Sequence, residues 1–172
     1  MKSTRAKVLI ESSFSLQIDL TTKQARKTKP IPKGFHSITP YLFAEHAQKL
    51  VDFLKEAFGA KQTNRITLPG GRLMHTEVKI GDSYLMMGEP TGELGPMQCS
   101  IYLYVEDCDN VYKRAIKAGG IPVMEPTNMG TGERYGGLKD PAGNIWWVAT
   151  HIKDVSQQEA QRAAEKYNQK ST

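Results

Sequence analysis

The stretch that decides the fold is residues 41–45, YLFAE, because a version of it returns as residues 102–106, YLYVE. The match continues without a gap, at the same offset of 61 positions, in two further places: residues 57–59 (AFG) with residues 118–120 (AGG), and residues 81–87 (GDSYLMM) with residues 142–148 (AGNIWWV). Few residues are identical, but the signals of a strand, a helix, a glycine stop and a closing strand recur in the same order. A period of this length indicates two copies of one supersecondary unit, each too small to bury its apolar face alone.

The first copy, which we call module one (residues 35–89), is predicted as a strand at 38–44, a helix at 45–58 and strands at 61–68, 72–80 and 83–87. The helix is indicated by apolar residues at spacings of three and four. These residues are Ala47, Leu50, Val51, Leu54 and Phe58. Gly59 is a common helix stop, and Gly81 with Asp82 predicts a tight hairpin.

The second copy, module two (residues 97–150), is predicted as a strand at 99–105, a helix at 107–118 and strands at 122–126, 133–139 and 144–150. Val111, Ala115 and Ile116 are expected to face inward. Proline tolerates a sheet edge better than its centre, so Pro122 and Pro126 favour an edge strand. Residues 156–159 (SQQE) form a capping box that opens a polar helix to about residue 168.

The composition is typical of a globular protein with one core. The 172 residues are 39% apolar and 24% charged. No run of about 18 apolar residues predicts a membrane span, and the N-terminus lacks a secretory pattern. Cys99 and Cys108 are expected to be reduced thiols in a cytoplasmic protein.

The positive charge belongs to residues 1–33. They carry eight Lys and Arg residues against Glu11 and Asp19, which gives this segment a net charge of +6. The whole chain has a net charge of +5, so the remaining residues hold a net charge of −1. The sequence therefore predicts no nucleic-acid partner. We expect residues 1–33 to be a disordered or loosely docked extension or a cloning remnant. Two alternatives stay open: a transit peptide, and either an extra edge strand from the alternating residues 14–20 or an arm onto a partner. The predicted organisation is this extension, a domain at 34–156 and a C-terminal helix and tail at 157–172.

Alternation along each strand separates a helix-packing face from an opposite one, which we call the open face. Met74, Val78 and Ile80 are predicted on the helix side, which puts His75 and Glu77 on the open face. The open face as a whole is aromatic with a few polar groups, the usual make-up of a small-molecule pocket. The residues predicted to bind a ligand are Thr39, Tyr41, Tyr84, Met86, Ser100, Tyr102, Tyr104, Arg134 and Trp147.

Each candidate has a structural alternative. Aromatic residues at strand spacing are also typical of a core. His75 and Glu77 are predicted as a catalytic pair, a general base with an orienting carboxylate, or as two metal ligands, but a half-buried polar couple has the same pattern. Arg134 either holds an anionic substrate group or lies at the surface beside a flexible loop.

Three stretches carry a resemblance to a known family: residues 38–42 (ITPYL), residues 74–82 (MHTEVKIGD) and residues 138–151 (LKDPAGNIWWVATH). With the tandem modules, they resemble the vicinal oxygen chelate superfamily of glyoxalases, bleomycin-resistance proteins and extradiol dioxygenases, and within it the PhnB-like branch. The resemblance covers roughly residues 36–156. It implies an α+β fold in which two tandem βαβββ modules form a curled mixed sheet, a cup with helices outside.

The resemblance also implies where a divalent metal would bind. The ligand positions of metal-dependent members fall here on Thr39, Met86, Ser100 and Trp147, which are poor ligands or none. The usual mechanism needs imidazole or carboxylate groups there. We therefore expect no cofactor of the usual kind, while a divalent metal held by His75 and Glu77 is not excluded.

Three functions stay open. The favoured one is a glyoxalase-like protein that binds a small, aromatic or planar ligand in the cup without the usual metal. The alternative is a metal-dependent or acid–base enzyme of lyase, isomerase or dioxygenase type that uses His75 and Glu77. Antibiotic sequestration ranks third, because the near-neutral folded part has no acidic excess for a strongly cationic drug. The resemblance also implies a homodimer, with or without exchange of modules.

Overall fold

The computed structural model describes residues 28–170, which from Ile31 onward belong to one compact unit. The alternating residues 14–20 lie outside the described range. The elements, in chain order, are β1 (Tyr41–Phe43), α1 (Ala47–Phe58), β2 (Lys61–Thr67), β3 (Leu73–Ile80), β4 (Ser83–Gly88), β5 (Ser100–Tyr104), α2 (Cys108–Lys117), β6 (Ile121–Asn128), β7 (Glu133–Lys139), β8 (Ile145–His151) and α3 (Gln157–Lys170).

The strands form two four-stranded mixed sheets, one for each module, with the orders β1-β4-β3-β2 and β5-β8-β7-β6. In each sheet the first strand runs parallel to the last strand of its module, and the other pairs are antiparallel. The prediction of an α+β fold with two tandem βαβββ modules is confirmed. Each module keeps its own sheet, and neither sheet closes into a barrel.

The strand register repeats together with the sequence. Tyr41 pairs with Met86 in module one, and Tyr102 pairs with Trp147 in module two. Both partners are displaced by the same offset that the sequence shows, from position 41 to 102 and from 86 to 147. The gapless sequence match therefore corresponds to structurally equivalent positions in the two sheets.

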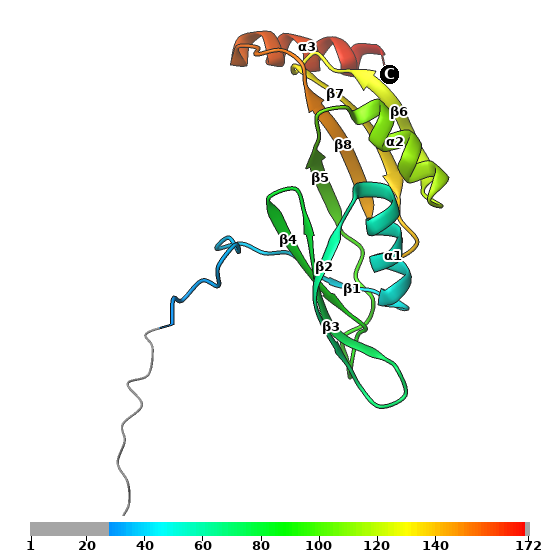
Figure 1. Ribbon diagram of the computed structural model, residues 1–172. Helices are drawn as coiled ribbons and strands as arrows, with labels where there is room; N and C mark the ends of the chain where they lie inside the picture. The colour runs from blue at the N-terminus through cyan, green and yellow to red at the C-terminus, as the bar shows by residue number, and fades with distance from the viewer. Residues whose placement is uncertain (1–27, 171–172) are drawn as a thin grey trace, which may run out of the picture. The chain divides into compact units, whose positions relative to one another are not determined.

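Helices α1 and α2 cover one side of the sheets and contact each other (Figure 1). All five residues of the predicted α1 stripe are buried, and Gly59 ends the helix with a φ of 68°. In α2 the carboxylate of Asp107 caps the N-terminus by accepting a hydrogen bond from the backbone N–H of Asn110 at 3.0 Å. Ala115 is buried as expected, and Val111 and Ile116 are half-buried and pack against the core. Tyr112, 3% exposed, is buried on the same helix.

The core continues from one module to the other. The rings of Phe58 in α1 and Trp146 in β8 lie 4.7 Å apart, and Nε of Arg114 in α2 donates to the carbonyl oxygen of Ala57 at 2.7 Å. Buried aromatic contact and a hydrogen bond to a helix end stabilise the junction.

The remaining boundaries differ from the predictions by a few residues. β6 is an edge strand, as the prolines indicate, but it is longer than predicted and its register to β7 shifts twice. The capping box of α3 is confirmed, since Ser156 and Glu159 exchange hydrogen bonds. Among the described residues, no helix is long and apolar enough to span a membrane.

Candidate functional site

The open face of module one lies opposite α1. Leu42, Val78 and Met87 are buried on the helix side, and the alternating residues of the same strands stay partly exposed. The open face thus carries the predicted residues Tyr41, His75, Glu77, Tyr84 and Met86.

The prediction that Met74 lies on the helix side of this sheet is wrong. Met74 is 41% exposed, and Leu73 is buried in its place at 1% exposure. The reason is a register irregularity: Ile66 pairs with His75, and the next residue, Thr67, pairs with Leu73. A bulge of this kind breaks the alternation on which the prediction depended.

Four polar side chains form a chain of contacts across the open face of module one. The hydroxyl of Tyr41 lies 3.4 Å from Nδ1 of His75, and Nε2 of His75 lies 3.4 Å from Oε1 of Glu77. The same carboxylate oxygen accepts a hydrogen bond from Nδ2 of Asn64 at 3.4 Å. Partial burial raises the pKa of Tyr41, so the phenol stays protonated at neutral pH and is able to donate. The arrangement suits a proton donor backed by an imidazole and a carboxylate.

Gly88 makes the first of these contacts possible. A Cβ at this position would lie 2.9 Å from the hydroxyl oxygen of Tyr41 and would also clash with the backbone carbonyl oxygen of Met74. The Tyr41 hydroxyl also donates to that carbonyl at 3.4 Å. The phenol therefore occupies the space that a larger residue on β4 would fill.

Tyr84 is stacked by a residue from the segment before β1. The rings of Phe35 and Tyr84 lie 4.2 Å apart at an interplanar angle of 19°, and the ammonium of Lys79 lies 5.8 Å from the same ring centroid. Phe35 thus covers one face of the Tyr84 ring.

The open face of module two is built around Trp147. Its indole lies across Gly137, where an added Cβ would be 2.5 Å from Cζ3 of the ring. The indole N–H donates to the hydroxyl of Ser100 at 3.0 Å. A glycine on β7 and a hydroxyl on β5 therefore fix the orientation of the tryptophan on the sheet.

Three tyrosines adjoin Trp147. Tyr135 makes edge contacts with both Trp147 and Tyr102, at 5.7 and 5.6 Å, and Tyr102 also contacts Tyr104 at 5.1 Å. Tyr102 and Tyr104 are 43% and 61% exposed. Burial, with smaller effects from neighbouring acidic groups, raises the pKa of Tyr102 to about 12, so its phenol is a donor at neutral pH.

Arg134 lies apart from this aromatic group. Its Nε and Nη2 both donate to the carboxylate of Asp109 in α2 at 2.6 Å, and Nη1 donates to Asn128 at 3.0 Å. The hydrogen bonds from Arg134 lower the pKa of Asp109. In this geometry the guanidinium is committed to the helix side of module two.

The residues at the family's metal-ligand positions do not fit a divalent ion. Thr39 donates to the carbonyl oxygen of His36 at 3.2 Å, and Ser100 accepts from the Trp147 indole. Met86 offers only a thioether, which is soft, and Trp147 offers no lone pair. Among residues 28–170, no group of three or more His, Cys, Asp and Glu side chains is arranged to hold a metal.

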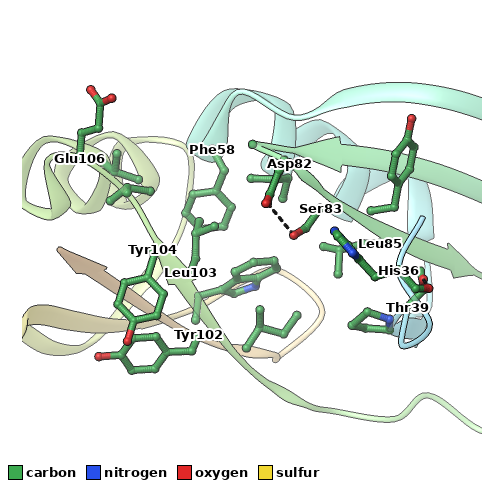
Figure 2. Close-up of a pocket in the computed structure, with 18 of the residues that line it drawn as sticks. His36, Thr39, Phe58, Asp82, Ser83, Leu85, Tyr102, Leu103, Tyr104 and Glu106 are labelled. Atoms are coloured by element: carbon green, nitrogen blue, oxygen red, sulfur yellow. Dashed lines mark hydrogen bonds between the residues drawn. The ribbon is translucent and has the colours of Figure 1, made fainter. Parts of the chain in front are cut away.

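A cleft of about 880 Å³ opens between the two modules (Figure 2). We call it the inter-module cleft; its principal lining residues are Thr39, Phe58, Ile80, Asp82, Tyr84, Leu85, Ile101, Tyr102, Leu103, Tyr104, Glu106, Asp107, Arg114 and Trp146. Thr39, Tyr84, Tyr102 and Tyr104 of the predicted ligand-binding set are among them. Most of the other lining side chains come from the helix-packing faces, so the cleft differs from the predicted cup.

Within one chain the two open faces stay separate groups. Tyr41 contacts Phe43 and His75 in its own module, and Tyr102 contacts Tyr104 and Tyr135 in its own. The structure thus brings together Tyr41, His75 and Glu77 in module one, and Ser100, Tyr102, Tyr104 and Trp147 in module two.

Several members of these groups were missed by sequence reasoning. Strand alternation on β7 places Tyr135 on the same face as Gly137, so its position was available from the pattern. Asn64 and Phe35 had no such signal, because their roles depend on a sheet register and on a loop path.

Comparisons with known proteins agree with this architecture. The family model described as Glyoxalase/Bleomycin resistance protein/Dioxygenase superfamily matches residues 34–148. An uncharacterized protein of Mycobacterium bovis is 30% identical over 139 residues, which cover 74% of this chain and 91% of that protein.

Two solved structures share the fold. TioX from Micromonospora sp. ML1 is 23% identical with a TM-score of 0.58, and the match covers 67% of this chain and 98% of TioX. A PhnB protein from Bacillus cereus is 17% identical with a TM-score of 0.56, over 67% of this chain and 99% of that protein. With the family match over the two modules, the chain belongs to the glyoxalase, bleomycin resistance protein and dioxygenase superfamily.

Proposed function

We propose that the chain binds a small planar or aromatic ligand on its open faces without the divalent metal usual in this superfamily. The observation that carries the proposal is the position of Trp147, flat across Gly137 and held by Ser100, beside the exposed rings of Tyr102 and Tyr104. Such a surface offers stacking area at little entropic cost, because the indole is already oriented.

Two phenols on the open faces support the same proposal. Tyr41 and Tyr102 would supply hydrogen-bond donors to a carbonyl or hydroxyl group of the ligand, since both phenols stay protonated at neutral pH.

We also propose a homodimer in which the open face of module one from one chain meets that of module two from its partner. The support is the exposure of both faces in a single chain, including Tyr41 at 38%, Tyr102 at 43% and Tyr104 at 61%. Large apolar side chains grouped on an exposed face mark interaction or ligand sites. Sedimentation velocity at several concentrations tests this, and a chain that stays monomeric throughout overturns it.

A screen of planar aromatic compounds by thermal shift and tryptophan fluorescence tests the ligand proposal. Trp147→Leu should abolish binding of a compound that stacks on the open face of module two, whereas Tyr112→Phe, a buried tyrosine of α2, should leave it unchanged. A ligand that binds the Trp147→Leu protein with full affinity would show that its binding site is not the open face around Trp147.

The second candidate is acid–base catalysis by Tyr41, His75 and Glu77. The specific observation in its favour is the chain of 3.4 Å contacts that joins the three side chains. This catalysis would be either metal-dependent or acid–base without a metal. Metal content by plasma mass spectrometry, before and after dialysis against Zn, Ni, Mn and Fe, distinguishes the two forms. About one ion per chain that is lost in His75→Ala would favour the metal-dependent form, and a turnover that depends on Tyr41 without bound metal would favour the acid–base form.

A further inference from the structure

The inter-module cleft is a hollow that the proposed open-face site leaves unexplained. One wall is the β3–β4 hairpin with the segment before β1, and the other is β5 with the first turn of α2. Its volume of about 880 Å³ lies in the usual range for small-molecule sites. We propose that this cleft binds an amphipathic amine, a small molecule with a flat or branched apolar body and one positively charged nitrogen.

The interior of the cleft is apolar. Phe58 and Trp146 meet at its base, where they are 8% and 1% exposed. Ile101 and Leu103 project from β5 and remain only half-buried in the free chain. A ligand body that covered these side chains would remove apolar surface from water, which favours binding.

The charges at the rim favour a cation. Three carboxylates line the cleft, from Asp82, Glu106 and Asp107, against the guanidinium of Arg114 and the imidazole of His36. The Asp107 carboxylate is already used by the α2 cap, where it accepts from the backbone N–H and Nδ2 of Asn110. Nε of Arg114 is likewise engaged with the Ala57 carbonyl. The charges left to interact with a ligand are therefore mainly negative.

Asp82 is the carboxylate best placed for the amine. Its Oδ1 accepts a hydrogen bond from the neighbouring Ser83 hydroxyl at 2.8 Å, which leaves its second oxygen for a ligand. Figure 2 shows Asp82 and Glu106 on either side of Phe58, with the Glu106 carboxylate directed outward. Glu106 then contributes to the local field, while Asp82 makes the contact.

The near-neutral charge of the folded part does not conflict with this. A strongly cationic molecule needs an acidic surface, whereas one amine needs one available carboxylate over an apolar floor. Asp82 is exposed, so the contribution of the ion pair is expected to be modest and sensitive to salt. The apolar body supplies most of the affinity.

A pair of planar dyes with opposite charge tests the proposal on the full chain. Proflavine is a flat cation, and anthracene carboxylate is a flat anion of similar size; both are titrated by fluorescence at low and high salt. We expect proflavine to bind at least tenfold more tightly. Asp82→Asn should weaken proflavine about threefold, and the matched variant Asp154→Asn, an exposed carboxylate outside the cleft, should not.

Two further variants locate the dye. Leu103→Trp, which fills the cleft, should weaken both dyes more than tenfold while circular dichroism stays unchanged. Trp147→Leu, on the open face, should leave proflavine affinity as it was. Equal or tighter binding of the anion overturns the proposal. So does proflavine binding that is lost in Trp147→Leu and kept in Leu103→Trp, which would instead support the open-face site. Proflavine affinity that falls as the chain self-associates would show that a second copy covers the cleft, and it overturns the proposal too.

Discussion

The phenol oxygen of Tyr41 lies 3.4 Å from Nδ1 of His75, although β4 separates their strands in the sheet. The contact crosses β4 at Gly88, which has no side chain to block it. Tyr41 on the edge strand β1 thus reaches His75 two strands away. The polar contacts of module one therefore depend on Gly88, although Gly88 has no polar side chain to contribute.

We predict that Gly88→Ala destabilises the fold by about 1–3 kcal/mol, the usual cost of overpacking. The added methyl group would meet the Met74 carbonyl oxygen, which is fixed by the backbone, as well as the movable Tyr41 hydroxyl. Urea unfolding measures the loss. Gly95→Ala is the matched control, because nothing lies within 4 Å of a Cβ there. Equal stability of the two variants would contradict the account of Gly88.

Asp140 carries a second prediction. Its carboxylate is 2% exposed and accepts four hydrogen bonds: from the backbone N–H groups of Ala142 and Asn144, from Nδ2 of Asn144 and from the indole N–H of Trp146. Asp140→Ala leaves these buried donors unpaired, so we expect a loss of about 3–5 kcal/mol. Thermal and urea unfolding measure it. Asp82→Ala, on the corresponding exposed turn of module one, should cost less than about 0.5 kcal/mol; a similar loss in both would show that the network contributes little.

The Asp109–Arg134 pair predicts a pH dependence. Its hydrogen bonds hold the pKa of Asp109 below the ordinary value of 3.8. A carboxylate with a lowered pKa in the folded state contributes stability above its unfolded pKa and loses it as the pH falls through the folded value. Wild type should therefore be more stable than Asp109→Asn at neutral pH, and the difference should shrink as the pH falls from about 4 to about 2.

Urea midpoints at several pH values measure this difference. Asp154→Asn is the control, because Asp154 is fully exposed and pairs only with His151 in the described chain. The gap should also shrink in high salt, because both partners are partly exposed. A gap that is constant down to the acid limit would show that the pair does not titrate with folding.

Much of this arrangement followed from the repeat. The offset of 61 positions predicted the equivalence of the Tyr41–Met86 and Tyr102–Trp147 pairs, because a gapless match carries strand register with it. Alternation placed His75 and Glu77 together on one face. It failed at Met74, where a bulge adds a residue, and a bulge leaves no periodic signal.

The site contacts were harder to predict. Arg134 was predicted to bind a ligand on the open face, yet its guanidinium turns to Asp109 on α2. A long side chain at a strand end is directed by the nearest charge, and the distance to Asp109 depends on helix packing that the sequence does not express. The inter-module cleft was also missed, because its lining residues come from both modules, and the packing of α1 against α2 that brings the modules together is not expressed in the sequence.

Gly137→Ala gives a prediction for the open face of module two. The added methyl group would meet the outer ring atoms of Trp147 at 2.5 Å, and these atoms are the far end of a side chain, which is able to move away from β7 when pushed. We therefore expect the indole to lift off β7 and lose its hydrogen bond to Ser100, with a smaller stability loss than in Gly88→Ala. Tryptophan emission should shift to longer wavelength, because Trp147 becomes more hydrated while Trp146 stays at 1% exposure. Trp147→Phe in the same background should remove the shift, and an unchanged spectrum in Gly137→Ala would mean that the glycine does not position the ring.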